Sequence, residues 1–287
     1  MKLARFTLDG QTRLGRIDGD RITDLTACFP EYGDSMRALL TDLPTRRDEI
    51  ASAKGPESLL SEVMLEAPIN DPQKYLAIGM NYKAHAEESA KAGIPVPTTQ
   101  LWFNKQVSCI NGPYAPLALP TVAPDKVDYE AEMGVVIGKR CRHVSREDAR
   151  SVIAGYLVCN DVSTRDWQLR SPTFTLGKSF DTHGPIGPWI TTDDEIADPH
   201  ALELDLYLNG ELRQHTSTGD MIYDIYDQIA HLSTVMTLEP GDVIATGTPS
   251  NVGIATNTFM QPGDVVRVEV TGLGYIENTF KPEAEIG

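Results

Sequence analysis

Paired cysteines are missing from this 287-residue chain. Its four cysteines are far apart in the sequence and form no C-x-x-C motif: Cys28, Cys109, Cys141 and Cys159. A disulfide scaffold or a structural zinc site needs several cysteines at short, repeated spacings, so the pattern argues against both. Reduced thiols in a protein of this length indicate a cytoplasmic location.

Long apolar runs and an excess of basic residues are missing too. No apolar stretch approaches the roughly 18 residues that a membrane-spanning helix needs, and the charges at Lys2 and Arg5 come too early for the apolar h-region of a signal peptide. With 25 basic and 41 acidic residues, the formal net charge is -16. An acidic surface repels phosphate backbones and anionic lipids, so we expect no nucleic-acid or membrane partner. A small anionic substrate remains compatible, because a bound cation can reverse the potential inside a pocket.

Turn and proline signals divide the chain unequally. Residues 1–27 alternate between short strand patterns and Asp-Gly turns, which predicts a small β-meander. Residues 35–65 are compatible with helix but are interrupted at Pro44 and at Gly55-Pro56. The prolines of the Pro68–Pro72 segment predict a linker. We therefore expect a small N-terminal β-rich domain over residues 1–70 and a catalytic domain over residues 71–287.

The larger part of the chain reads as strands with a few helices. Apolar strand patterns cover Tyr75–Gly79, Met133–Ile137 and Tyr156–Cys159, and Asn209-Gly210 predicts a tight hairpin between Leu204–Leu208 and Glu211–Arg213. Helical patterns are expected over Ala84–Ala92, Arg146–Ala154 and Tyr223–Met236. The predicted fold class is α+β, mostly β.

Three carboxylates mark a candidate metal site. Glu130 and Glu132 lie two residues apart at the start of a strand pattern and so project from the same face. Asp161 ends the next apolar strand. Carboxylate oxygens favour a hard cation such as Mg²⁺ or Mn²⁺. The alternative is a solvated strand end with Asp161 bonded to nearby backbone.

Two further segments carry candidate catalytic groups. If a helix begins after Tyr82, His85 and Glu88 lie at i and i+3 on one face, where a carboxylate could orient a general base. A surface pair would show the same spacing. Lys178, flanked by apolar residues, is a candidate contact for a substrate carboxylate, although most lysines are exposed.

The order of these motifs closely resembles the fumarylacetoacetate hydrolase family. H-x-x-E, E-x-E, the Asp of N-D-V-S-T-R-D, then G-K-S-F-D and T-G-T-P-S follow one another across roughly residues 74–282. The resemblance implies a rolled mixed β-sheet catalytic domain, usually dimeric. It implies Glu130, Glu132 and Asp161 as ligands of Mg²⁺ or Mn²⁺, and His85 with Glu88 as a water-activating dyad on a lid segment. It further implies that substrate contacts Lys178, with Arg165, Gln168 and Thr248 as pocket candidates.

By this resemblance we expect a homodimeric hydrolase that cleaves the C3–C4 bond of a 2,4-dioxo acid. The acid would be an acylpyruvate or a 2,4-diketo-3-deoxy sugar acid, and the products pyruvate and a carboxylic acid. Some acylpyruvate hydrolases of the family carry Arg where this chain has Met80, so the substrate need not be identical. The alternatives are a decarboxylase of the oxaloacetate type, an isomerase of an unsaturated 2-oxo dicarboxylic acid, and a metal-binding scaffold without turnover.

Overall fold

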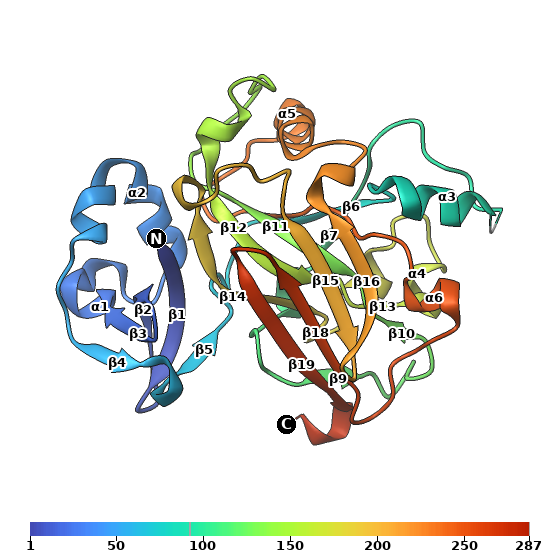
Figure 1. The fold of residues 1–287 in the computed structure, drawn as a ribbon, viewed down its shortest axis with the longest axis horizontal. Helices are drawn as coiled ribbons and strands as arrows, with labels where there is room; N and C mark the ends of the chain where they lie inside the picture. Colours follow the sequence, from blue (N-terminus) through green and yellow to red (C-terminus); the bar gives the residue numbers. More distant parts are fainter. Residues whose placement is uncertain (92, 287) are drawn as a thin grey trace.

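The computed structural model describes residues 1–91 and 93–286, and its N-terminal part forms a distinct lobe (Figure 1). The lobe contains a run of antiparallel strands: β1 (Lys2–Leu8), β2 (Gln11–Asp18), β3 (Arg21–Asp24), β4 (Glu57–Leu59) and β5 (Met64–Glu66). Two helices accompany them, α1 (Leu25–Cys28) and α2 (Met36–Ala51). The Asp-Gly turns therefore connect strands as the sequence predicts.

Helix α2 runs through Pro44, where the sequence predicts an interruption. Proline removes one backbone hydrogen bond from the helix interior, which is a local cost. Tertiary packing offsets that cost, because Leu39, Leu40 and Leu43 are all buried in one hydrophobic cluster. The prediction of a break at Pro44 is therefore wrong.

A large mixed sheet crosses the middle of the molecule. Its path runs β4-β3-β2-β1-β14-β12-β11-β17-β6-β7 within the described residues. The strands outside the N-terminal lobe are β6 (Tyr75–Gly79), β7 (Leu101–Lys105), β11 (Ala131–Ile137), β12 (Ile153–Asn160), β14 (Gly184–Thr192) and β17 (Val243–Ala245). The β1–β14 pairing joins the two predicted domains into one sheet. The domain boundary near residue 70 stays a prediction.

The central strands are buried on both faces because their apolar side chains alternate between two cores. Val135 of β11 and Tyr156 of β12 belong to one cluster, whereas Val136 and Leu157 belong to the cluster that also holds α2. Side chains with a period of two point to opposite faces of a strand. Continuous apolar sequence is thus what a sheet covered on both sides requires.

A second sheet packs on the face away from α2. Its order is β16-β15-β18-β19-β9, and its strands are β15 (Glu203–Leu208), β16 (Glu211–Ser217), β18 (Val265–Val270), β19 (Gly274–Pro282) and β9 (Leu117–Leu119). Asn209 and Gly210 have positive φ angles, as the predicted tight hairpin requires. Three further strands have two residues each: β8 (Ile110–Asn111), β10 (Val127–Asp128) and β13 (Ser163–Thr164). The predicted mostly β, α+β fold with a rolled mixed sheet is confirmed.

The remaining helices are few. They are α3 (Lys83–Lys91), α4 (Arg165–Gln168), α5 (Ile225–Val235) and α6 (Gly253–Thr256). Figure 1 shows α3, α4 and α6 on the side of the molecule away from the N-terminal lobe. No helix of the described residues is both long and apolar enough to cross a membrane.

One helix prediction is wrong. Over Arg146–Ala154 the structure has only a short 3-10 turn at Ala149–Val152, and β12 begins at Ile153. The apolar residues at the end of this segment extend a buried strand that pairs with both β11 and β14. Tertiary pairing therefore outweighs the local helical pattern. The predicted helix over Ala84–Ala92 is present as α3, and residue 92 lies outside the described residues.

Candidate active site

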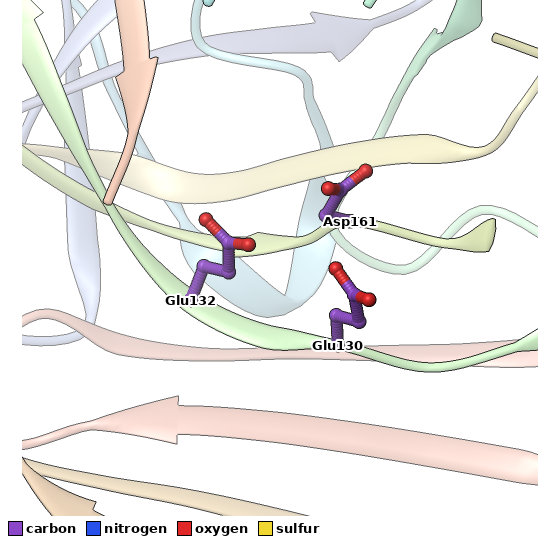
Figure 2. Close-up of side chains that lie close together, drawn as sticks. All are labelled: Glu130, Glu132 and Asp161. Carbon is purple, nitrogen blue, oxygen red and sulfur yellow. The ribbon is translucent and has the colours of Figure 1, made fainter. Parts of the chain in front are cut away.

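The pairing of β11 with β12 brings three carboxylates together. Glu130 directly precedes β11, Glu132 lies within it, and Asp161 directly follows β12. Antiparallel pairing sets Ala131 opposite Asn160, and the Asp161 N–H donates to the Glu130 carbonyl at 2.9 Å. All three side chains are buried and point toward one another (Figure 2). One oxygen from each lies within 4.8 Å of the others.

The three carboxylates sit in different electrostatic environments. Burial, reinforced by the charges of Asp161 and Glu130, raises the pKa of Glu132 well above its ordinary value. Burial also opposes ionisation of Glu130, but Lys178 and Arg165 overcome that and lower its pKa to about 2. Like charges this close repel one another unless a proton or a cation is shared between them. The cluster is therefore suited to a cation.

Two buried lysines border the carboxylates. The Lys178 ammonium donates to Glu130 Oε2 at 2.6 Å and to Asp161 Oδ2 at 2.7 Å. Lys105, which the sequence analysis missed, donates to Asp161 Oδ1 at 2.6 Å. The strand pattern does mark this lysine. Leu101, Phe103 and Lys105 are two residues apart and lie on one face of β7, so Lys105 occupies a position where an apolar residue is expected. The exposed-lysine alternative for Lys178 is wrong, since this side chain is buried.

Arg165 is held by acidic residues on two sides. Its Nε donates to Asp128 Oδ2 at 2.7 Å, and its Nη1 lies 2.8 Å from Glu130 Oε1 and 2.9 Å from Gln168 Oε1. Asp128 is buried and also accepts hydrogen bonds from the backbone N–H groups of α6. The guanidinium thus fixes the Glu130 side chain and joins it to the segment that bears α6.

Replacing Asp128 by asparagine should weaken both the fold and the metal site. Arg165 would lose one of its two buried counter-ions and keep Glu130, and weakening buried ion pairs in this way costs up to about 3 kcal/mol. Because Arg165 also positions Glu130, Mn²⁺ affinity should fall by about tenfold or more. Urea denaturation and calorimetry measure the two effects. Asp125→Asn, on an exposed side chain nearby, is the matched control and should change neither quantity.

His85 and Glu88 form a hydrogen-bonded pair on α3. His85 Nδ1 lies 3.1 Å from Glu88 Oε2, and Glu88 Oε1 accepts from the Asn251 N–H at 3.0 Å. Burial opposes ionisation of Glu88, but these two hydrogen bonds lower its pKa below the ordinary value. With the ring proton on Nδ1, Nε2 is left unprotonated and can accept a proton.

Asn81 anchors the segment that leads into α3, a role the sequence analysis did not identify. This side chain is buried, and its Nδ2 donates to the Thr246 carbonyl at 2.8 Å and to the Tyr223 carbonyl at 3.0 Å. Thr246 follows β17, the strand paired with both β6 and β11. The polar residue at 81 therefore fixes the start of α3 against the strand that borders the carboxylates.

One cavity of about 220 Å³ brings most of the predicted site residues together. Its wall includes His85, Glu88, Glu130, Glu132, Arg165, Gln168, Lys178 and Thr248. Asp161 is not part of the wall and lies behind it, bonded to both lysines. Thr248 Oγ1 accepts from Gln214 at 3.2 Å. The fold thus converts motifs spread over more than 160 residues into one concave site.

The donor set fits a divalent cation. Glu130, Glu132 and Asp161 supply only carboxylate oxygens, which suit Mg²⁺ or Mn²⁺ better than softer metals. Glu132 is further oriented by the Gly247 N–H, which donates to Oε2 at 2.8 Å. The residues that would hold the ion are therefore the three that the sequence predicts.

Comparison with known proteins shows the family to which the chain is similar. The family model "Fumarylacetoacetate (FAA) hydrolase C-terminal" matches residues 74–281. A protein of Burkholderia lata that carries only the general name hydrolase is 40% identical over 279 residues, which is 96% of each chain.

Two solved structures share nearly the whole fold. Maleylpyruvate hydrolase from Sphingobium sp. SYK-6, in complex with manganese(II) and pyruvate, has a TM-score of 0.83 and 36% identity, over 98% of this chain and 99% of that one. A 5-carboxymethyl-2-hydroxymuconate delta-isomerase from Mycobacterium smegmatis has a TM-score of 0.80 and 34% identity, over 99% of both chains.

Proposed function

The chain belongs to the fumarylacetoacetate hydrolase family, and we propose that it is a metal-dependent hydrolase of 2,4-dioxo acids. It would cleave the C3–C4 bond of an acylpyruvate or a 2,4-diketo-3-deoxy sugar acid and release pyruvate and a carboxylic acid. The observation that carries this proposal is the shared cavity, in which the His85–Glu88 pair faces the same space as Glu130 and Glu132 of the carboxylate cluster. A hydrolase needs a base for water as well as a site for the oxo acid.

The side chains of the cavity supply the proton transfers. Glu88 orients His85, and His85 Nε2 takes a proton from water as the water oxygen forms a bond to C4. As water adds, the π pair of the C4 carbonyl moves to its oxygen. When that pair re-forms the C4=O bond, the C3–C4 bond breaks and its electron pair remains with the three-carbon fragment. The proton taken by His85 is returned to C3, which yields pyruvate, and the hydroxyl stays on C4 in the carboxylic acid. Lys178 adds positive charge beside the group on which negative charge develops.

Glu130, Glu132 and Asp161 would hold the cation, for which we propose Mg²⁺ or Mn²⁺. When bound, a divalent cation supplies Lewis-acid stabilisation of charge on the substrate oxygens. The manganese and pyruvate bound by the Sphingobium maleylpyruvate hydrolase support this proposal. Homodimeric assembly and a cytoplasmic location stay predictions.

An isomerase is the second candidate, because the M. smegmatis structure with this fold is named an isomerase. Isomerisation of an unsaturated oxo acid leaves the mass of the substrate unchanged and needs no attacking water. The His85–Glu88 pair favours hydrolysis, since a base oriented by a carboxylate is suited to activate water.

The deciding assay is metal-dependent release of pyruvate from a panel of 2,4-dioxo acids. We expect pyruvate to appear with Mg²⁺ or Mn²⁺ and its release to stop with EDTA, as measured by a coupled pyruvate assay. Mass spectrometry of the products separates the alternatives: an isomer has unchanged mass, and a decarboxylase acting on oxaloacetate releases carbon dioxide. Absence of pyruvate across the panel would contradict the hydrolase proposal.

A further inference from the structure

Away from the carboxylates, the wall of the 220 Å³ cavity is predominantly apolar. Leu101 and Phe103 project from β7, and Phe174 packs edge-on against Phe103 with ring centroids 6.0 Å apart. Exposed apolar side chains border the same cavity: Ile94, Leu169 and Ile254. Large apolar side chains that are exposed around one cavity indicate a surface that a ligand covers.

The cationic side chains of this wall already have acidic partners. Among the described residues, the lysine and arginine on the wall are Lys178 and Arg165. Lys178 bonds Glu130 and Asp161, and Arg165 bonds Asp128 and Glu130. A second carboxylate at the far end of a substrate would meet apolar side chains in a chain of net charge -16. An anion transferred to such surroundings loses hydration without gaining a partner.

We propose that the substrate is a 2,4-dioxo acid with a single carboxylate and an apolar acyl group, aliphatic or aromatic. This inference rests on the proposed function, which places the 2-oxo acid end at the carboxylate cluster and leaves the acyl group to the apolar wall. It selects acylpyruvates over 2,4-diketo-3-deoxy sugar acids. A polyhydroxylated acyl group would need several polar partners, whereas apolar side chains predominate on this wall, and the side-chain oxygens of Gln168 and Thr248 each already accept a hydrogen bond, from Arg165 and Gln214.

Binding of matched 2-oxo acids to the manganese-loaded protein tests the proposal without turnover. 2-Oxohexanoate and 2-oxohexanedioate have the same carbon chain and differ in the terminal group, methyl or carboxylate. Calorimetry should show the monocarboxylate binding at least about tenfold tighter. From 2-oxobutanoate to 2-oxohexanoate, affinity should rise about fourfold for each buried methylene. Equal or tighter binding of the dicarboxylate would overturn the proposal.

A charge placed at the cavity edge provides the reciprocal test. Leu169 is 67% exposed, so Leu169→Arg should fold normally and supply the cation that the wall lacks. We expect 2-oxohexanedioate to gain about tenfold in affinity and 2-oxohexanoate to lose affinity. Val235→Arg adds the same charge at a similarly exposed position (64%) that is not on the wall, and it should change neither ligand.

The binding measurements and the pyruvate assay can reject the two proposals separately. A tenfold preference for the monocarboxylate without any pyruvate release would reject the hydrolase but keep the apolar acyl site. Pyruvate release with no preference, or with preference for the dicarboxylate, would keep the hydrolase and reject the apolar acyl site. No change of preference in Leu169→Arg would also count against the apolar wall as the site of the acyl group.

Discussion

Asp161→Asn is expected to abolish metal-dependent turnover and to lower Mn²⁺ affinity by more than about 100-fold. Asp161 is one of three carboxylates that approach within 4.8 Å, and the substitution removes its negative charge while keeping its size. Loss of a direct ligand should exceed the 10- to 100-fold effect typical of residues that only orient ligands. Calorimetric titration with Mn²⁺ measures the affinity, and the coupled pyruvate assay measures turnover.

The control for Asp161→Asn must separate metal loss from unfolding. Asp161 also neutralises the buried ammonium groups of Lys105 and Lys178, so the variant will be less stable. Circular dichroism should nevertheless show a folded protein below its lowered melting temperature, where both assays are made. Asp198→Asn makes the same substitution at an exposed site and should keep full affinity and turnover. A folded Asp161→Asn protein with full activity would refute the assignment of this residue to the metal site.

His85→Ala is expected to lower kcat by about 100- to 10,000-fold, the usual contribution of a positioned general base. Metal binding should persist, because His85 hydrogen-bonds Glu88 and is not one of the three residues that would hold the ion. The pyruvate assay gives kcat. Titrations with Mn²⁺ and with 2-oxohexanoate show whether the metal site and the ligand site are intact. We expect kcat to fall while the affinities for Mn²⁺ and for 2-oxohexanoate stay unchanged.

Glu87→Ala is the matched control for His85→Ala, because Glu87 is exposed on the same helix. It should leave kcat unchanged. Glu88→Gln should fall between the two, since the amide can still accept from the histidine but carries no charge. If His85→Ala cleaved substrate at the wild-type rate, water activation by this residue would be wrong, and an isomerase or a decarboxylase would become the better proposal.

Local patterns predicted the strands and the hairpin well. Tyr75–Gly79 is β6, residue for residue, and the tight Asn209-Gly210 turn joins β15 to β16. These signals are local: a run of β-forming residues, or two residues that tolerate positive φ. The helix prediction over residues 146–154 was wrong because the end of this segment pairs with two strands, β11 and β14, that are distant in the sequence. A local pattern holds no information about such partners.

The candidate site was only partly visible in the sequence. Glu130 and Glu132 could be placed on one face because extended chain has a period of two, and His85 and Glu88 because a helix brings i and i+3 together. The contribution of Asp128 was not foreseen, since its contacts run to α6 and Arg165. Nor was Arg165 expected to be committed to two carboxylates.

The sequence by itself therefore determined the residue types of the site, the faces on which neighbouring residues lie, and the order of motifs that indicates the family. The tertiary structure decided which of these groups meet. The β11–β12 register sets Asp161 beside Glu130, and β7 carries Lys105, whose ammonium group donates to Asp161. It also decided that the cavity beyond the carboxylates is apolar. These contacts join residues that are far apart in the sequence. They form because the whole core becomes buried, so the neighbouring residues in the chain do not determine them.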